Sequence, residues 1–159
     1  MVMIRQKNYV ITLIFILCFF TFFRPFIANQ ITKRGDGYLG FDMNQDAIRQ
    51  YKKALLLEPK KINTKNWLAY AYSRSGRMEE AIKTYIDSLR LSPANIVAYH
   101  ELGMIYAMKK DFKLAKPYFL KASSISREES FLSEEDYDFY HKGSIRMLEA
   151  CRKRLGESL

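Results

Sequence analysis

The sequence predicts an all-α protein built as a stack of antiparallel helix pairs. The first observation is a repeat with a 34-residue spacing, in which Ala81 recurs as Ala115 and Tyr85 as Phe119. The second is a composition of 48% apolar and 27% charged residues, which excludes a largely disordered chain. The third is a long apolar run near the N-terminus. Together they predict a helical repeat domain that follows an N-terminal membrane helix.

The apolar run covers residues 9–23 and is closed by Arg24, whose long side chain can reach a membrane interface. Extended to residue 28 it approaches the number of residues that a helix needs to cross a bilayer. We therefore expect residues 1–28 to be an N-terminal anchor that contacts the membrane through residues 9–28. The chain would then be a single-pass membrane protein.

A cleaved signal peptide is the alternative to an anchor. It is disfavoured because bulky residues precede Ala28, where a cleavage site needs small ones. Basic residues flank the apolar run on both sides, so the positive-inside rule hardly decides the orientation. The absence of acidic residues before Asp36 favours a repeat domain on the extracytoplasmic side.

The repeat domain is predicted to span residues 29–129, and its first unit, about 28–61, is degenerate. Glycines at positions 35, 37 and 40 each disfavour a helix. Gly35 nevertheless lies two periods before Gly103, and Tyr38 lies one period before Tyr72. We interpret this stretch as a repeat helix that its neighbours must hold in shape.

Capping residues and helix breakers place the other repeat helices, with the second and third units at 62–95 and 96–129. The predicted helices are Gln45–Leu57 capped by Asn44, a helix from Asn63 or Thr64 to Gly76, Met78–Leu91, Ile96–Met108 capped by Asn95, and Phe112–Ser124 capped by Asp111.

Two residues break the pattern. Lys110 stands where the preceding repeat has Gly76, so this turn needs a left-handed non-glycine residue or another geometry. Pro117 lies inside a predicted helix, removes one backbone hydrogen bond and is expected to bend that helix.

A C-terminal helix is predicted to cap the stack within residues 130–159. Ser133 followed by three acidic residues marks its start, and basic residues in its last turn suit the helix dipole. The capping helix is Glu134–Leu155, and the side chains expected to face the stack are Tyr137, Tyr140, Ile145, Leu148 and Cys151.

The spacing of small and bulky residues resembles the tetratricopeptide repeat pattern. The resemblance implies a right-handed superhelix whose first helices line a concave, peptide-binding groove. The pattern departs from the family at Lys65, Ser88, Lys110 and Arg127. The residues that carry the resemblance are Gly76, Ala81, Tyr85, Pro93, Tyr99, Leu102, Gly103, Tyr106, Phe112, Ala115, Phe119 and Ala122.

The resemblance also implies which residues line the groove. Trp67 lies two positions past the family's usual aromatic place, which rotates its side chain about 200° away from the core stripe. Trp67 is either a hot spot for a bound helix or extended peptide, or a packing residue against the preceding repeat. The implied groove residues are Asn63, Asn66, Trp67, Tyr70, Ser73, Arg74, His100, Glu101, Met104 and Met108.

Some family members clamp a peptide's terminal carboxylate with basic and amide side chains. Asn66 and Arg74 fit such a clamp, but Tyr70, Glu101 and Met104 occupy the neighbouring places. We therefore predict an apolar and hydrogen-bonding grip on the partner instead of a carboxylate clamp.

Nothing in the sequence predicts catalysis, a cofactor or a metal site. His100 and His141 are far apart in the sequence and have no cysteine nearby, and Cys18 and Cys151 have no metal-ligand spacing. A non-catalytic scaffold or adaptor at a membrane, binding a protein or peptide partner, is the predicted function.

Two alternatives remain open. The first is an exported soluble repeat protein that self-associates. The second is a nucleic-acid-binding helical protein, which the formal charge of +9 permits. Nucleic acid is the weaker alternative because no base-reading motif accompanies the lysine cluster at positions 109, 110, 113, 116 and 121.

Overall fold

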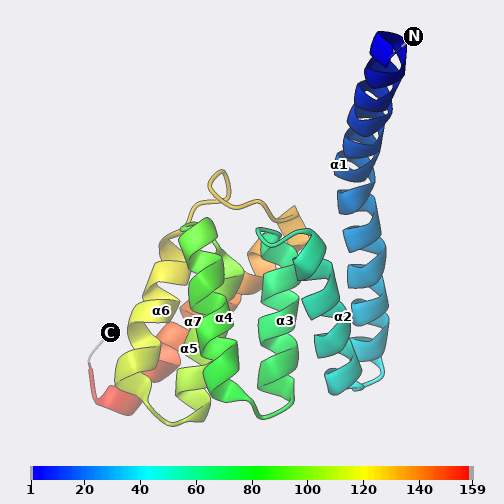
Figure 1. The fold of residues 1–159 in the computed structure, drawn as a ribbon. Helices are drawn as coiled ribbons and strands as arrows, with labels where there is room; N and C mark the ends of the chain where they lie inside the picture. The colour runs from blue at the N-terminus through cyan, green and yellow to red at the C-terminus, as the bar shows by residue number, and fades with distance from the viewer. Residues whose placement is uncertain (1, 158–159) are drawn as a thin grey trace. The chain divides into compact units, whose positions relative to one another are not determined.

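The structure, a computed structural model, describes the backbone of residues 2–157 and the side chains of residues 12–13 and 17–157. Within these residues all regular secondary structure is α-helical, in seven helices (Figure 1). The chain divides into two compact units, Met1–Lys61 and Ile62–Leu159. The first unit is one helix pair, and the second contains two further pairs and a final helix.

The first unit pairs α1 (Val2–Gly40) with α2 (Asn44–Leu57). Gly35 makes this pairing possible, because a Cβ added there would lie 2.5 Å from Cε1 of Tyr51. The Tyr51 hydroxyl donates a hydrogen bond of 2.8 Å to Asp36 Oδ1. The predicted anchor and the predicted first repeat helix are therefore parts of one continuous helix.

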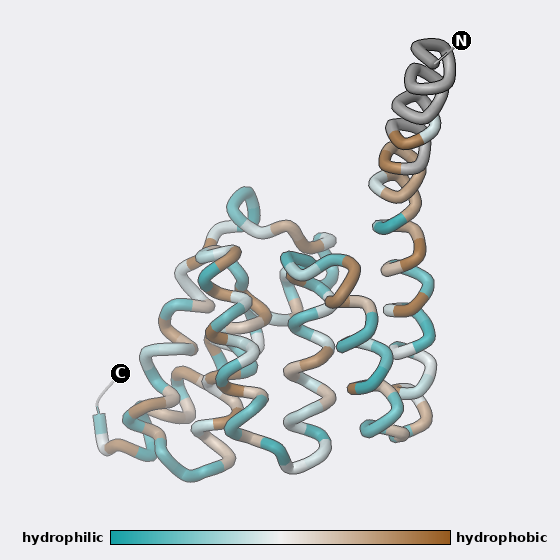
Figure 2. Tube along the Cα trace, in the orientation of Figure 1, coloured by the Kyte–Doolittle hydropathy of each residue, from teal (hydrophilic) through white to brown (hydrophobic). Residues whose placement is uncertain are grey.

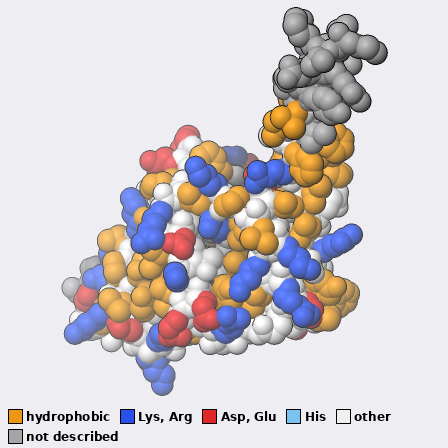
Figure 3. Space-filling view, viewed as in Figure 1, with side chains coloured by type: hydrophobic (Ala, Val, Ile, Leu, Met, Phe, Trp, Pro, Cys, Tyr) orange, Lys and Arg blue, Asp and Glu red, His pale blue; other side chains and the backbone are white. Residues whose placement is uncertain are grey.

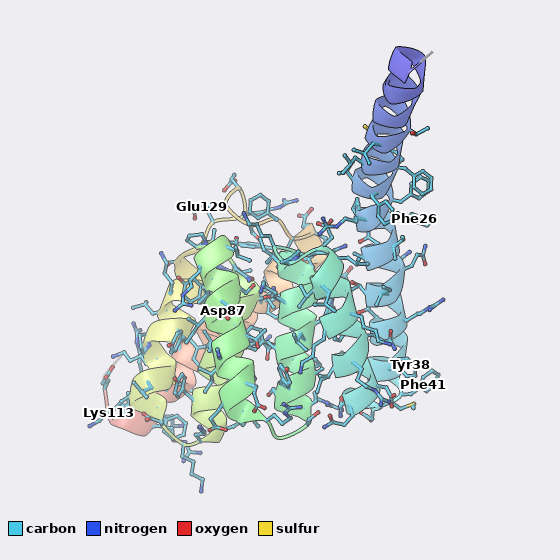
Figure 4. The ribbon with its side chains drawn as sticks, in the orientation of Figure 1. Phe26, Tyr38, Phe41, Asp87, Lys113 and Glu129 are labelled. Carbon is cyan, nitrogen blue, oxygen red and sulfur yellow. The ribbon has the colours of Figure 1, made fainter. Side chains whose placement is uncertain are left out.

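Hydrophobic residues are frequent along the described part of α1 (Figure 2), and the side chain of Phe26 is exposed (Figure 4). In the part of the chain that the structure describes, no helix is long and apolar enough to cross a membrane. The predicted apolar run includes residues 9–11 and 14–16, which lie outside the described side chains. The membrane anchor remains a prediction.

The second unit begins with two helix pairs. These are α3 (Ile62–Arg74) with α4 (Met78–Leu91), and α5 (Ile96–Met108) with α6 (Phe112–Ser124). Small residues such as Ala81 and Ala115 are fully buried beside the fully buried rings of Tyr85 and Phe119. Small side chains let the helix backbones approach, and the rings fill the space between them.

The close contact of the first unit recurs in the second. A Cβ on Gly103 would lie 2.7 Å from Cε1 of Phe119, just as a Cβ on Gly35 would approach Tyr51. The two glycines and the two rings are each separated by two repeat periods. At both positions an aromatic ring packs directly against the helix backbone, which leaves no room for a Cβ atom. This contact explains why each helix contains a glycine although glycine disfavours a helix.

Most predicted caps are confirmed. The side chains of Asn95, Asp111 and Ser133 accept hydrogen bonds from the backbone N–H groups of their own helices. Lys110 adopts the left-handed conformation, with φ of 61°, as Gly76 does with φ of 74°.

The predicted cap at Asn44 was wrong. Met43 precedes α2, no side chain caps this helix end, and Asn44 Oδ1 is buried without a hydrogen-bond partner. Asn44 is the first residue of α2 because the chain turns immediately before it, between Phe41 and Met43. The α6 helix continues through Pro117 without interruption, and the predicted bend remains a prediction.

The final helix, α7 (Glu134–Leu155), packs against α6 and α5. Leu148 and Cys151 are buried against Ala115 and Phe119, as predicted. Ile145 was predicted to face the stack but is 38% exposed. Ser144 takes the buried position instead, because it lies one helical turn before Leu148 and its hydroxyl hydrogen-bonds His100 of α5.

Candidate functional site

A cavity of about 420 Å³ opens in the second unit between α3, α5 and the start of α7. The helix α4 also contributes to its lining through Tyr85. Cavities of this size are typical of ligand sites. The lining residues are Asn63, Asn66, Trp67, Tyr70, Tyr85, Val97, Glu101, Leu132, Asp136, Phe139 and Tyr140.

The wall on α3 is aromatic. Trp67 is 42% exposed, and its ring centroid lies 6.2 Å from that of Tyr70 at an interplanar angle of 80°. Helical periodicity explains its position, since Leu68, Ala71 and Tyr72 form the buried stripe of the same helix and leave Trp67 on another face.

The opposite wall comes from α7 and the segment before it. Phe139 is 64% exposed, and its ring meets that of Tyr140 edge to face, with centroids 5.1 Å apart. Leu132 and Asp136 complete this wall. Sequence reasoning missed these four residues as site residues, although it had placed Tyr140 on the face of α7 toward the stack.

Two polar residues of the cavity wall differ in burial: Tyr85 is fully buried, and Glu101 is half-buried. Burial raises the pKa of the Glu101 carboxyl to about 7. The fully buried Tyr85 hydroxyl has no hydrogen-bond partner among the described residues. Burial, and then the charge of Glu101, raise the pKa of Tyr85 well above its ordinary value. A buried polar group without a hydrogen-bond partner lowers the stability of the fold. A polar group of a ligand could supply the missing hydrogen bond in this cavity.

Asn66 lines the cavity, but its amide is committed to a buried hydrogen-bond network. Its Oδ1 accepts from Ser88 Oγ at 2.8 Å and from Asn95 Nδ2 at 3.0 Å, and its Nδ2 donates to Asn95 Oδ1 at 3.2 Å. The polar atoms of Asn66 therefore join α3, α4 and α5, and its role as a contact for a partner stays a prediction. Ser88, a departure from the repeat pattern, belongs to the same network.

His100 and Met104 contact α7 and do not line the cavity, and their role as groove contacts stays a prediction. His100 Nδ1 lies 2.9 Å from Ser144 Oγ, whose own hydrogen is donated to the Tyr140 carbonyl at 2.7 Å. The imidazole is therefore the donor to Ser144. Burial lowers the pKa of His100 to about 4. Met104 packs against the apolar cluster that includes Leu148.

Three other predicted groove residues do not line the cavity. Ser73 donates a hydrogen bond to Met78 Sδ at 3.7 Å, near the end of α3. Arg74 is exposed at that end, and Met108 is 55% exposed at the end of α5. They lie one or more turns along their helices from the cavity residues Tyr70 and Glu101, which is why the cavity does not reach them. Of the predicted set, Asn63, Trp67, Tyr70 and Glu101 line the cavity with side chains outside the buried amide network.

The basic residues of the second unit do not gather at the cavity, which no Lys or Arg lines. On the face shown in Figure 3, basic and acidic side chains are interspersed. Lys109 pairs with Glu79 at 2.9 Å, and Lys116 pairs with Glu157. In the described part of the chain, no group of three His, Cys, Asp or Glu residues could hold a metal ion.

Comparison with known proteins finds a repeat family along part of the second unit. Residues 61–128 match the family described as tetratricopeptide repeat. A TPR repeat-containing protein of Methanocaldococcus jannaschii is 34% identical over 97 residues, which cover 59% of this chain. That match spans only 17% of the relative's own length. Proteins of the matched repeat family are non-catalytic scaffolds, in agreement with the prediction that this chain is not an enzyme.

Solved structures share the fold at low sequence identity. The structure of PcrH in complex with the chaperone-binding region of PopD has a TM-score of 0.70 and 15% identity, and covers 79% of this chain and 91% of that one. The first TPR of Spaghetti (RPAP3), bound to the HSP90 peptide SRMEEVD, has a TM-score of 0.67 and 17% identity, with coverage of 82% and 94%. At such identities the likeness concerns the fold alone.

Proposed function

We propose that this chain, whose residues 61–128 are tetratricopeptide repeats, is a scaffold or adaptor that binds a partner polypeptide in the cavity beside Trp67. The observation that carries the proposal is the half-exposed aromatic wall on α3 above enclosed polar groups that lack partners. An exposed tryptophan in a concave site is the usual anchor for a polypeptide ligand. Structural neighbours that hold peptides in the same fold support this assignment.

The proposed grip is apolar and hydrogen-bonding. Trp67, Tyr70 and Phe139 supply apolar contact, and Tyr85 supplies a hydroxyl. The HSP90 peptide in the RPAP3 complex is acidic, whereas Glu101 and Asp136 give this cavity negative charge. Like charges repel in an enclosed site, so we propose a partner other than a peptide with a free acidic end.

A crosslinking pull-down with the full chain tests the proposed function. Trp67→Ala should lower partner recovery at least tenfold, because the substitution removes the largest exposed ring of the cavity. Met108→Ala is the matched control, since Met108 is exposed on α5 and does not line the cavity. Unchanged recovery with Trp67→Ala would contradict the assignment.

We further propose that residues 9–28 attach the chain to a membrane, with the repeat domain on the extracytoplasmic side. Support comes from the exposed aromatic rings on α1, which include Phe19, Phe20, Phe22 and Phe26. Such a surface is costly in water and suits lipid.

Fractionation tests the attachment. The anchored chain should stay with membranes in high salt and keep its N-terminus, and its domain should be digested by protease added outside the cell membrane. Release by salt with a shortened N-terminus would instead favour an exported soluble protein that self-associates.

A further inference from the structure

The cavity beside Trp67 combines ring faces with negative charge. Trp67 and Tyr70 on α3 and Phe139 and Tyr140 on α7 line it. The face of an aromatic ring carries partial negative charge and attracts cations, most strongly for tryptophan. Together with Tyr85, five aromatic residues line the cavity and favour a positively charged group over a carboxylate.

Two carboxyl groups reinforce this preference. Glu101 makes no hydrogen bond or ion pair in the described part of the chain, although it is largely enclosed. Asp136 stands across the cavity and accepts a hydrogen bond of 2.7 Å from Ser133 at Oδ2, which leaves Oδ1 available. No Lys, Arg or His lines the cavity to balance these charges.

The Tyr85 hydroxyl adds a third polar group. It is fully buried, lines the same cavity and has no hydrogen-bond partner among the described residues. A hydroxyl oxygen accepts hydrogen bonds from N–H donors. A ligand group rich in N–H donors would satisfy Tyr85 and Glu101 together.

From these features we propose that the cavity binds a basic side chain, lysine or arginine, of the partner polypeptide. The inference rests on the proposed function and specifies the chemistry of its ligand. The aliphatic part of the basic side chain lies between Trp67 and Phe139, its charged end pairs with Glu101, and its N–H groups donate to Tyr85. A neutral apolar side chain would leave Glu101 and Tyr85 enclosed without partners, which is unfavourable.

Trp67 is the only tryptophan of the chain, so its fluorescence reports directly on the cavity. The full chain in a nonionic detergent is titrated at pH 8 with N-acetyl-arginine amide, N-acetyl-lysine amide and N-acetyl-norleucine amide. The arginine or the lysine amide should give a saturable change with an affinity at least tenfold higher than that of the norleucine amide. The norleucine probe matches the length of the aliphatic part and lacks the charge.

A matched pair of variants identifies the carboxyl group. Glu101→Gln should weaken binding of the basic amides at least fivefold, because it removes the charge and keeps the shape. Glu135→Gln is the control, since Glu135 is exposed in the same acidic region and does not line the cavity. It should leave binding unchanged, and both variants retain the fluorescent reporter.

Three results would contradict the inference: equal affinity for the norleucine amide, no effect of Glu101→Gln, or a tighter response to choline than to either basic amide. None of these results contradicts the proposed function if Trp67→Ala still lowers partner recovery at least tenfold. Partner recovery that survives Trp67→Ala overturns the proposed function instead, whatever the amides do. The two claims therefore fail separately.

Discussion

Two regions on the first helices of the repeats in the second unit differ in exposure: one lines an open cavity, and the other is covered by α7. On α3, Trp67 and Tyr70 line an open cavity, and Trp67 is substantially exposed. On α5, His100 and Met104 are covered by α7 through the Ser144 hydrogen bond and the Leu148 cluster. Both halves belong to first helices of successive repeats. The difference arises because α7 covers the half at His100 and Met104 and leaves the cavity beside Trp67 open.

The largest expected effect comes from loosening the covered half. Leu148→Ala removes a buried side chain that packs against Phe119, and should lower the free energy of unfolding by about 2–5 kcal/mol. Urea unfolding measures the loss. Hydrogen exchange should also show that the amides of α7 lose protection before those of α3.

Ile145→Ala is the control for Leu148→Ala, since Ile145 lies on the same helix and is partly exposed. It should cost no more than about 1 kcal/mol. If both variants lowered the free energy of unfolding equally, the packing of α7 against the stack through Leu148 would be contradicted.

The second prediction separates structural from ligand-facing amides in the open half. Asn66→Ala should lower the free energy of unfolding by about 1–3 kcal/mol, because Ser88 and Asn95 lose buried hydrogen-bond partners. Asn63→Ala, at an exposed position on the cavity rim, should change it by less than about 0.5 kcal/mol. Thermal unfolding of both variants compares them directly. Similar values would remove the distinction between the two asparagines.

The smallest expected effect concerns the charge of Glu101. Its folded pKa, about 7, exceeds the ordinary value of 4.5, so the folded state binds the additional proton between these limits. The destabilisation from the charged carboxyl therefore grows as pH rises from 4.5 to about 7 and is fully present at higher pH. Glu101→Gln should raise the free energy of unfolding by about 1–2 kcal/mol at pH 8 and leave it nearly unchanged at pH 4.

His100 acts in the opposite direction in the covered half. Its folded pKa, about 4, lies below the ordinary value of 6.5, so its stabilising contribution is present above pH 6.5 and is lost as pH falls toward 4. Comparing Glu101→Gln with the unmodified chain at each pH cancels this contribution, because both carry His100. A difference that does not depend on pH would contradict the enclosed state of Glu101.

Local sequence signals predicted the helices well because they act over short distances. The caps at Asn95 and Asp111, the left-handed Lys110 and the bounds of α4 to α7 follow from side-chain chemistry within one turn. The predicted cap at Asn44 was wrong because the turn before α2 makes Asn44 the first residue of that helix. The prediction for Ile145 was wrong because Ser144, which hydrogen-bonds His100, takes the buried position on α7.

The site was predictable only in part. Helical periodicity placed Trp67 off the buried stripe, and the structure finds it exposed in the cavity. The burial of Asn66 depends on partners in α4 and α5, and the cover over His100 depends on how α7 crosses α5. Such long-range contacts leave no periodic trace, which is why Phe139 and Asp136 were also missed.

Site-specific photocrosslinking tests the division of the concave face most directly. A photoreactive benzoylphenylalanine replaces either Tyr70, in the open half, or Met104, in the covered half, of the full chain. We expect adducts with a partner protein from position 70, and internal crosslinks to α7 around Leu148 from position 104. Partner adducts from position 104, or only internal crosslinks to α7 from position 70, would contradict it.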